Sequence, residues 1–174
     1  MAETNNAEVK TNELSAEELA QQYTGSLVEK ALEAERIYAT YSQEQVDKIV
    51  AAMALAGSEA SLELAQEAHE ETGRGVVEDK DTKNHFATEY VYERIKNEKT
   101  VGIIGEDKVA GSIQIAAPLG VLAGIVPTTN PTSTTMFKIL VALKTRYAIV
   151  FAFLPQAQIC CAHAAKFLYD AAVK

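Results

Sequence analysis

The sequence contains no tryptophan, and its 174 residues include only 4 prolines and 2 cysteines. The cysteines, Cys160 and Cys161, are adjacent, a spacing that rarely gives a disulfide and fits no zinc-binding pattern. No second cluster of cysteine and histidine completes a metal site. We therefore predict no metal centre, and two reduced thiols on a helix.

Long apolar runs are also missing. None approaches the roughly 18 residues that a membrane-spanning helix needs. The N-terminus has neither the basic nor the apolar region of a secretory signal. We therefore expect a cytoplasmic protein. Basic residues are few, and the formal net charge of -8 argues against nucleic acid and anionic membranes as partners.

The charge is distributed unevenly. Residues 1–100 hold 21 acidic and 10 basic side chains, whereas residues 101–174 hold 3 and 6. A slightly basic half favours an anionic ligand such as a phosphate. The alternative is that this half carries fewer charges because more of it is buried.

The first half of the chain has the pattern of a helical segment. Residues 1–13 are polar and are predicted to form a disordered tail, followed by helices over residues 14–100. Ser15 and Ser42 each begin a capping box, which marks a helix start. A third helix should end at Gly73.

A fourth helix is predicted over about residues 78–97, with Phe86, Tyr90 and Ile95 facing inward. The pattern then changes. In residues 101–116, two short apolar stretches flank a charged turn at residues 106–108, which predicts a β-hairpin.

Strands and helices alternate over residues 117–174. The continuous apolar run Val121–Val126 predicts a strand covered on both faces. A helical apolar pattern follows from Met136, then a strand at Ala148–Phe151, then a helix that opens at Pro155. This βαβα order predicts an α/β fold with a parallel sheet.

The stretch GIVPTTNPTSTTMFK, residues 124–138, joins the first of these strands to its helix. Ligands bind in this position in open α/β sheets, and the first turn of a helix offers free N–H groups. The Asn130 amide could donate to a carbonyl oxygen that gains charge during a reaction. The structural alternative is that threonine caps the helix and Pro131 begins it.

Residues 117–146, APLGVLAGIVPTTNPTSTTMFKILVALKTR, resemble the aldehyde dehydrogenase module of bifunctional aldehyde-alcohol dehydrogenases, the CoA-acylating acetaldehyde dehydrogenases. Residues 41–50, 71–92 and 97–107 show the same resemblance in the same order. It implies an aldehyde dehydrogenase-like fold, in which N-terminal helices and a β-hairpin precede the first βαβα units of an incomplete Rossmann-like sheet.

The resemblance also implies a function. The family is NAD-dependent and reversibly converts acetaldehyde and CoA to acetyl-CoA through a cysteine thiohemiacetal and thioester, in fermentative metabolism. Residues 101–116 would belong to the element that forms homo-oligomers, and residues 117–174 would begin the NAD-binding domain. The nicotinamide site would be lined by Ile125, Val126, Pro127, Thr128, Thr129 and Asn130.

The identity of the oxyanion donor stays open between two residues. General aldehyde dehydrogenases place an asparagine two residues after a proline, whereas Asn130 comes three residues after Pro127. Either Thr129 or Asn130 takes that position. We favour Asn130, because an amide N–H is the better donor to an oxyanion.

Several parts of the family pattern are absent from these 174 residues: the Gly-rich turn for the cofactor pyrophosphate, the catalytic cysteine and the catalytic domain. Cys160 and Cys161 do not take the nucleophile's role, although His163 could bias a thiol on the same helix. Residues 152–157, AFLPQA, replace a Ser-Pro-His-Pro-Arg-Ala-like stretch beside the cofactor ribose.

Two hypotheses follow. The chain is the N-terminal part of a CoA-acylating aldehyde dehydrogenase, or it is a truncated, non-catalytic homologue that oligomerises with a full-length partner. Under both, we expect the isolated chain to lack dehydrogenase activity. We also expect it to be unstable or to self-associate, because its last strand would expose an edge and an apolar face.

Overall fold

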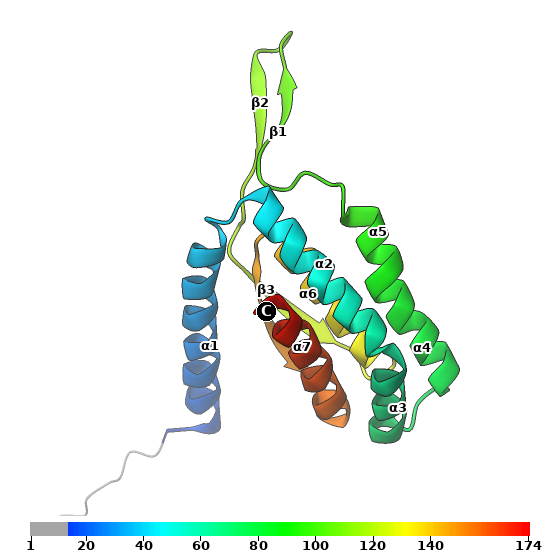
Figure 1. Ribbon diagram of the computed structural model, residues 1–174. Helices are drawn as coiled ribbons and strands as arrows, with labels where there is room; N and C mark the ends of the chain where they lie inside the picture. The colour runs from blue at the N-terminus through cyan, green and yellow to red at the C-terminus, as the bar shows by residue number, and fades with distance from the viewer. Residues whose placement is uncertain (1–13) are drawn as a thin grey trace, which may run out of the picture.

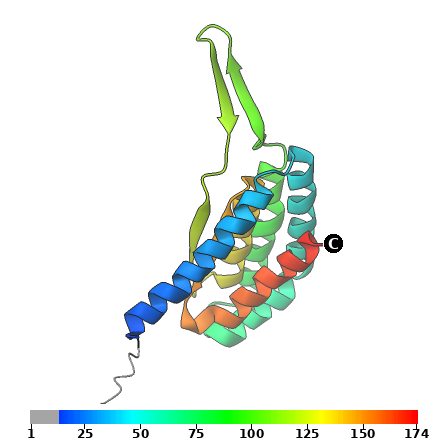
Figure 2. The ribbon, with the colours of Figure 1, turned by 90° about the vertical axis from the view of Figure 1, so that its left-hand side faces the viewer.

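The computed structural model describes residues 14–174, and the predicted tail at residues 1–13 lies outside them (Figures 1 and 2). The elements are, in order, α1 (Ala16–Tyr38), α2 (Gln43–Glu59), α3 (Ser61–Thr72), α4 (Val77–His85), the π-helix η1 (Phe86–Tyr90), α5 (Val91–Ile95), β1 (Gly102–Asp107), β2 (Ser112–Ala116), β3 (Val121–Val126), α6 (Pro131–Lys144), β4 (Ala148–Phe153), the 3-10 helix η2 (Pro155–Ala157) and α7 (Gln158–Ala172). No helix within residues 14–174 is both long and apolar enough to cross a membrane.

The predicted helix boundaries in the first half are confirmed. Ser15 and Ser42 both form complete capping boxes, in which each hydroxyl accepts the amide of the third helical residue. Gly73 ends α3 in the left-handed conformation, with φ of 63°. These boundaries were predictable because each depends on a few neighbouring residues.

The core lies where α2, α6 and α7 meet. α2 supplies Val46, Val50 and Met53, while α6 supplies Met136 and Leu140, and all five are at most 1% exposed. Leu64 of α3 and Leu168 of α7 belong to the same cluster. The apolar face predicted for α6 therefore packs into the core.

The fourth predicted helix is present, and Ile95 packs against the core as predicted, but the inward placement of Phe86 and Tyr90 is wrong. Phe86 and Tyr90 are 61% and 66% exposed, and their rings stack on each other with centroids 5.8 Å apart. The buried side chains of α4 and η1 are Lys80, Asn84, Ala87 and Thr88. The π-helix between α4 and α5 explains the error, because its wider turn shifts the register that a regular α-helix would keep.

Strands β3 and β4 pair in parallel, from Val121 opposite Ala148 to Val126 opposite Phe153, which confirms the predicted parallel arrangement. α1 and α6 both contact these strands, and the strands lie between α1 and the remaining helices (Figures 1 and 2). No residue of α1 is buried, so this helix covers its face of the sheet loosely.

The prediction that Val121–Val126 is covered on both faces is wrong for this chain. Gly124 and Val126 are buried, but Leu122 and Ile125 are 39% and 68% exposed. Within residues 14–174 the sheet has two strands and so leaves an edge of each unpaired. Self-association of the isolated chain stays a prediction.

The hairpin of β1 and β2 projects away from the helices (Figures 1 and 2). Its turn begins two residues later than predicted, because Glu106 and Asp107 pair with the second strand. The Asp107 carboxylate accepts the amides of Val109 and Ala110 at 2.9 and 3.0 Å and so shapes the turn. Most side chains on both faces are exposed, which leaves the hairpin without a covering layer in this chain.

Candidate functional site

The segment from Pro127 to Asn130 joins the carboxyl end of β3 to the N-terminus of α6. It lies beside the end of β4, because Val126 and Phe153 are the last paired residues of the two strands. The predicted location at the carboxyl edge of a parallel sheet is therefore where the structure places it. Ligands in open α/β sheets bind at this edge.

Asn130 is the N-cap residue of α6, yet its side chain accepts no hydrogen bond from the helix. An N-cap asparagine normally accepts the amide of the second or third helical residue. Here Nδ2 makes one long contact of 3.4 Å to the Thr129 hydroxyl, and the buried Oδ1 has no partner. Nδ2 thus keeps at least one N–H that a ligand could accept, whereas Oδ1 is buried.

A cavity of about 390 Å³ opens beside Asn130. One wall comes from the start of α6 and the other from α4, η1 and α5. The lining residues are Lys83, Phe86, Ala87, Val91, Asn130, Ser133, Thr134 and Phe137. An apolar cavity with a few convergent polar groups suits a small organic ligand whose polar end faces the amide. Phe86, wrongly predicted to lie in the core, is part of this wall.

Two buried polar residues of α4 hold the segment in place. Lys80 Nζ donates to the Thr129 carbonyl oxygen at 3.3 Å, and the Thr132 hydroxyl donates to Asn84 Oδ1 at 2.8 Å. The pKa of Lys80 is lowered, mainly by burial and then by the nearby Lys83. Sequence reasoning missed both residues, although polar side chains four residues apart in a helical pattern were a visible signal.

The other predicted site residues differ in how far their side chains are exposed. Ile125 is 68% exposed, whereas the Val126 side chain is fully buried in a core cluster and can offer a ligand only its backbone. Pro127 and Thr129 are exposed, and Thr128 is half-buried. Of the predicted site residues, Thr129 and Asn130 are hydrogen-bonded to each other through their side chains.

The two cysteines are buried in α7, at 1% and 0% exposure. A hydrogen bond with Cys161, burial and the Glu71 carboxylate together raise the pKa of the Cys160 thiol above its usual value. A nucleophilic cysteine needs the opposite environment, which is exposed and electropositive. Burial of both thiols and the raised pKa of Cys160 are unfavourable for a nucleophile, and their exclusion from that role stays a prediction.

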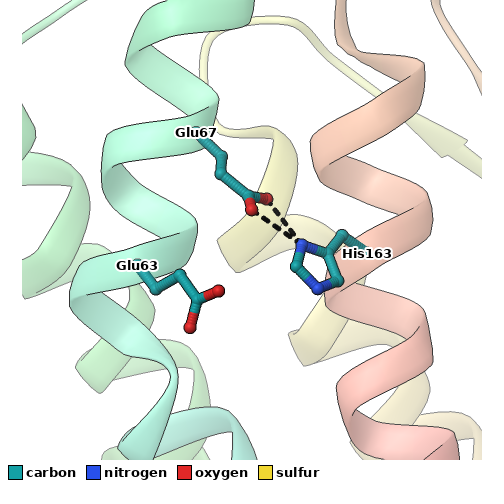
Figure 3. A group of neighbouring side chains, drawn as sticks. All are labelled: Glu63, Glu67 and His163. Carbon is teal, nitrogen blue, oxygen red and sulfur yellow. Dashed lines mark hydrogen bonds and ion pairs between the residues drawn. The ribbon is translucent and has the colours of Figure 1, made fainter.

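His163, the residue that could have biased Cys160, is paired elsewhere. Its Nδ1 lies 2.8 Å from both carboxylate oxygens of Glu67 on α3, and Glu63 lies one turn away (Figure 3). One ligand-type atom from each of the three lies within 4.8 Å of the others, a grouping that a divalent cation could use. The His163–Glu67 contact is complete without a cation, so we interpret it as a hydrogen bond between α3 and α7.

The backbone amides at the N-terminus of α7 already have a side-chain partner. The Glu71 carboxylate accepts the amides of Ile159 and Cys160 at 2.9 and 2.8 Å. Burial alone would raise the pKa of Glu71, but these donated bonds lower it below its ordinary value of 4.5. The first turn of α7 is therefore capped by the protein, in contrast to that of α6.

Glu71→Ala is expected to lower the free energy of unfolding by about 1 kcal/mol at pH 7, the usual effect of losing a helix cap. Because the folded pKa is depressed, this stabilisation is complete above about pH 4.5 and is lost as the pH falls through the folded pKa. Urea unfolding at pH 7 and at pH 3 measures it. An equal deficit at both pH values would contradict the capping role, and the exposed Glu70→Ala serves as the control.

Comparison with known proteins gives a consistent result. The aldehyde dehydrogenase family model matches residues 4–174. The chain is 52% identical over 148 residues to the bifunctional aldehyde-alcohol dehydrogenase of Escherichia coli (strain K12), which is 85% of this chain and 17% of that protein.

Solved structures agree. An acetylating aldehyde dehydrogenase from Geobacillus thermoglucosidasius is 47% identical with a TM-score of 0.86, over 89% of this chain and 34% of that one. A propionaldehyde dehydrogenase from Rhodopseudomonas palustris, solved with bound CoA and an acylated cysteine, is 25% identical with a TM-score of 0.70, over 86% and 34%.

The chain thus spans 17% of the length of that curated relative and 34% of each of these two solved chains. The family model nevertheless covers almost all of it, including the hairpin, the parallel strand pair and the segment before α6. The chain belongs to the aldehyde dehydrogenase family.

Proposed function

We propose that this chain forms the N-terminal part of an NAD-dependent, CoA-acylating acetaldehyde dehydrogenase of fermentative metabolism. The reaction converts acetaldehyde, CoA and NAD to acetyl-CoA and NADH, reversibly. The observation that carries the proposal is the Asn130 side chain, an N-cap amide that does not cap its helix and whose Nδ2 makes only one long hydrogen bond. The likeness to the E. coli bifunctional enzyme supports the same reaction.

In this proposal Asn130 acts on the carbonyl oxygen of the aldehyde. A cysteine thiolate from elsewhere in the native polypeptide attacks the carbonyl carbon, and negative charge develops on the oxygen. The Asn130 amide N–H donates to that oxygen and stabilises it. The N-terminus of α6 adds a partial positive charge on the same side. The aldehyde's alkyl group lies in the cavity walled by Phe86 and Phe137.

The nicotinamide end of NAD fits the segment that ends β3. Ile125 and Thr129 are exposed there, and the Thr129 hydroxyl offers a polar contact. NAD supplies the hydride acceptor when it is bound. The ribose end fits less well, because residues 152–157 carry no charged side chain and Leu154 is 44% exposed at the end of β4. We therefore expect weak NAD binding by this chain alone.

The second candidate function is a non-catalytic homologue that oligomerises through its hairpin. The exposed isoleucines of β1 and β2 favour it, with Ile103 51% and Ile115 66% exposed. We propose that the hairpin has this oligomerisation role in either case. The two functions differ in whether the native polypeptide catalyses the reaction.

The test compares the native polypeptide that carries these residues, purified from its own cells, with the 174-residue chain alone. We expect the native polypeptide to form NADH from acetaldehyde and NAD only when CoA is present. We expect the chain alone to form none, because its two thiols are buried. NADH formation by the chain alone, or a native polypeptide without CoA-dependent turnover, would contradict the proposal.

A further inference from the structure

Lys80 is a buried cation without an anionic partner. It is 4% exposed, and none of the ion pairs among residues 14–174 includes it. Burying an ammonium group without a counter-charge is unfavourable, and proteins usually avoid it. Lys144, by comparison, is 2% exposed and is paired with Asp47. A contribution to stability therefore does not account for Lys80.

The Lys80 ammonium donates a hydrogen bond to the Thr129 carbonyl oxygen, at 3.3 Å. The peptide that joins Thr129 to Asn130 is trans, so its C=O and N–H point in opposite directions. Fixing the oxygen toward α4 therefore fixes the plane of this peptide and the position of the Asn130 Cα, from which the side-chain amide projects. The ammonium also polarises this peptide, because a charged donor forms the stronger hydrogen bond.

Asn84, one turn along α4, provides a second anchor. It is fully buried, and its Oδ1 accepts the Thr132 hydroxyl at 2.8 Å. Its Nδ2 donates to the Ser61 carbonyl oxygen at 2.9 Å, which fixes the amide orientation from the other side. The backbone on either side of Asn130 is thus held from α4 at Thr129 and at Thr132.

We propose that Lys80 and Asn84 are positioning residues that hold the Thr129–Thr132 backbone, and so aim the Asn130 amide at the reacting carbonyl oxygen. This inference rests on the proposed function. Neither residue lines the cavity beside Asn130, so each acts through the segment and not on the substrate. A misplacement of about 1 Å in an active site is enough to slow a reaction as much as 100-fold.

The test uses Lys80→Met in the native polypeptide, since methionine keeps the chain length and removes the charge. We expect kcat/KM for acetaldehyde to fall roughly 10- to 100-fold. The melting temperature should stay the same or rise, because an unpaired buried charge has been removed. Hydrogen exchange at the amides of residues 129–134 should become faster. The exposed Lys48→Met should change none of these quantities.

Unchanged hydrogen exchange in Lys80→Met would overturn the positioning role, whatever the activity. Faster exchange with unchanged kcat/KM would overturn its link to catalysis. If Lys80→Met does not fold, Thr132→Val provides the test. It removes only the second anchor, the hydrogen bond to Asn84, and should speed hydrogen exchange of the same amides. A wild-type polypeptide without CoA-dependent activity would refute the proposed function instead, and the exchange result would still stand by itself.

Discussion

Replacing Asn130 with alanine in the native polypeptide is expected to lower kcat for acetaldehyde oxidation by about 100- to 1,000-fold, the usual loss when one oxyanion donor is removed. Stability should hardly change. Losing an N-cap asparagine normally costs about 1 kcal/mol, but this side chain makes no capping bond. Steady-state kinetics and thermal unfolding of the same preparation measure the two effects.

The matched variant is Thr129→Val, which removes the other polar group that could occupy the oxyanion position. Its carbonyl bond to Lys80 stays in place, because that bond uses the backbone. We expect it to lower kcat much less than Asn130→Ala does. A large loss in Thr129→Val together with normal kcat in Asn130→Ala would assign the role to Thr129.

Asp47→Ala is expected to lower the free energy of unfolding by about 3 kcal/mol, the lower end of the range for stranding one partner of a buried ion pair. Lys144 is 2% exposed, and its Nζ lies 2.6 Å from Asp47 Oδ1 and 3.0 Å from the Lys96 carbonyl oxygen. The lower end applies because the Asp47 side chain is 40% exposed, so water partly replaces the carboxylate. Urea unfolding at pH 7 measures the loss.

Lys144 also contributes to a group of hydrogen bonds at the base of the hairpin. The Thr100 hydroxyl donates to the Lys144 carbonyl oxygen at 2.6 Å, and Gln43 Oε1 accepts the Thr100 and Val101 amides.

The control for Asp47→Ala is Asp170→Ala, which breaks an exposed pair with Lys166 and should cost at most about 1 kcal/mol.

The double variant Asp47→Ala with Lys144→Met should recover part of the loss caused by Asp47→Ala, because it removes the stranded charge together with its partner. Equal destabilisation by Asp47→Ala and Asp170→Ala would show that the Lys144 pair contributes no more than a surface pair.

Features that depend on a few neighbouring residues were predictable from the sequence. The serine caps at Ser15 and Ser42 and the left-handed stop at Gly73 belong to this class. The parallel pairing of β3 with β4 followed from the order of elements. The π-helix at Phe86 was not predictable, because it follows from how the helix fits the core and has no local signature.

The candidate site was likewise only partly predictable from the sequence. Asn130 was found from its position between a strand and a helix, but its missing capping bond is visible only in the structure. Lys80 and Asn84 were missed because their contacts, to Thr129 and Thr132, span 49 and 48 residues of sequence. Exposure of Ile125 was missed because an apolar run suggests a buried strand, whatever covers it.

The most direct test of the account is a crystal structure of the native polypeptide in which the acyl thioester on its catalytic cysteine is trapped. We expect the Asn130 amide nitrogen to lie about 2.7–3.1 Å from the thioester carbonyl oxygen, the range for an oxyanion donor. We also expect the Lys80 ammonium still to contact the Thr129 carbonyl oxygen. An acyl group bound with its oxygen out of reach of Asn130, at donors from other parts of the polypeptide, would contradict the proposed role of Asn130.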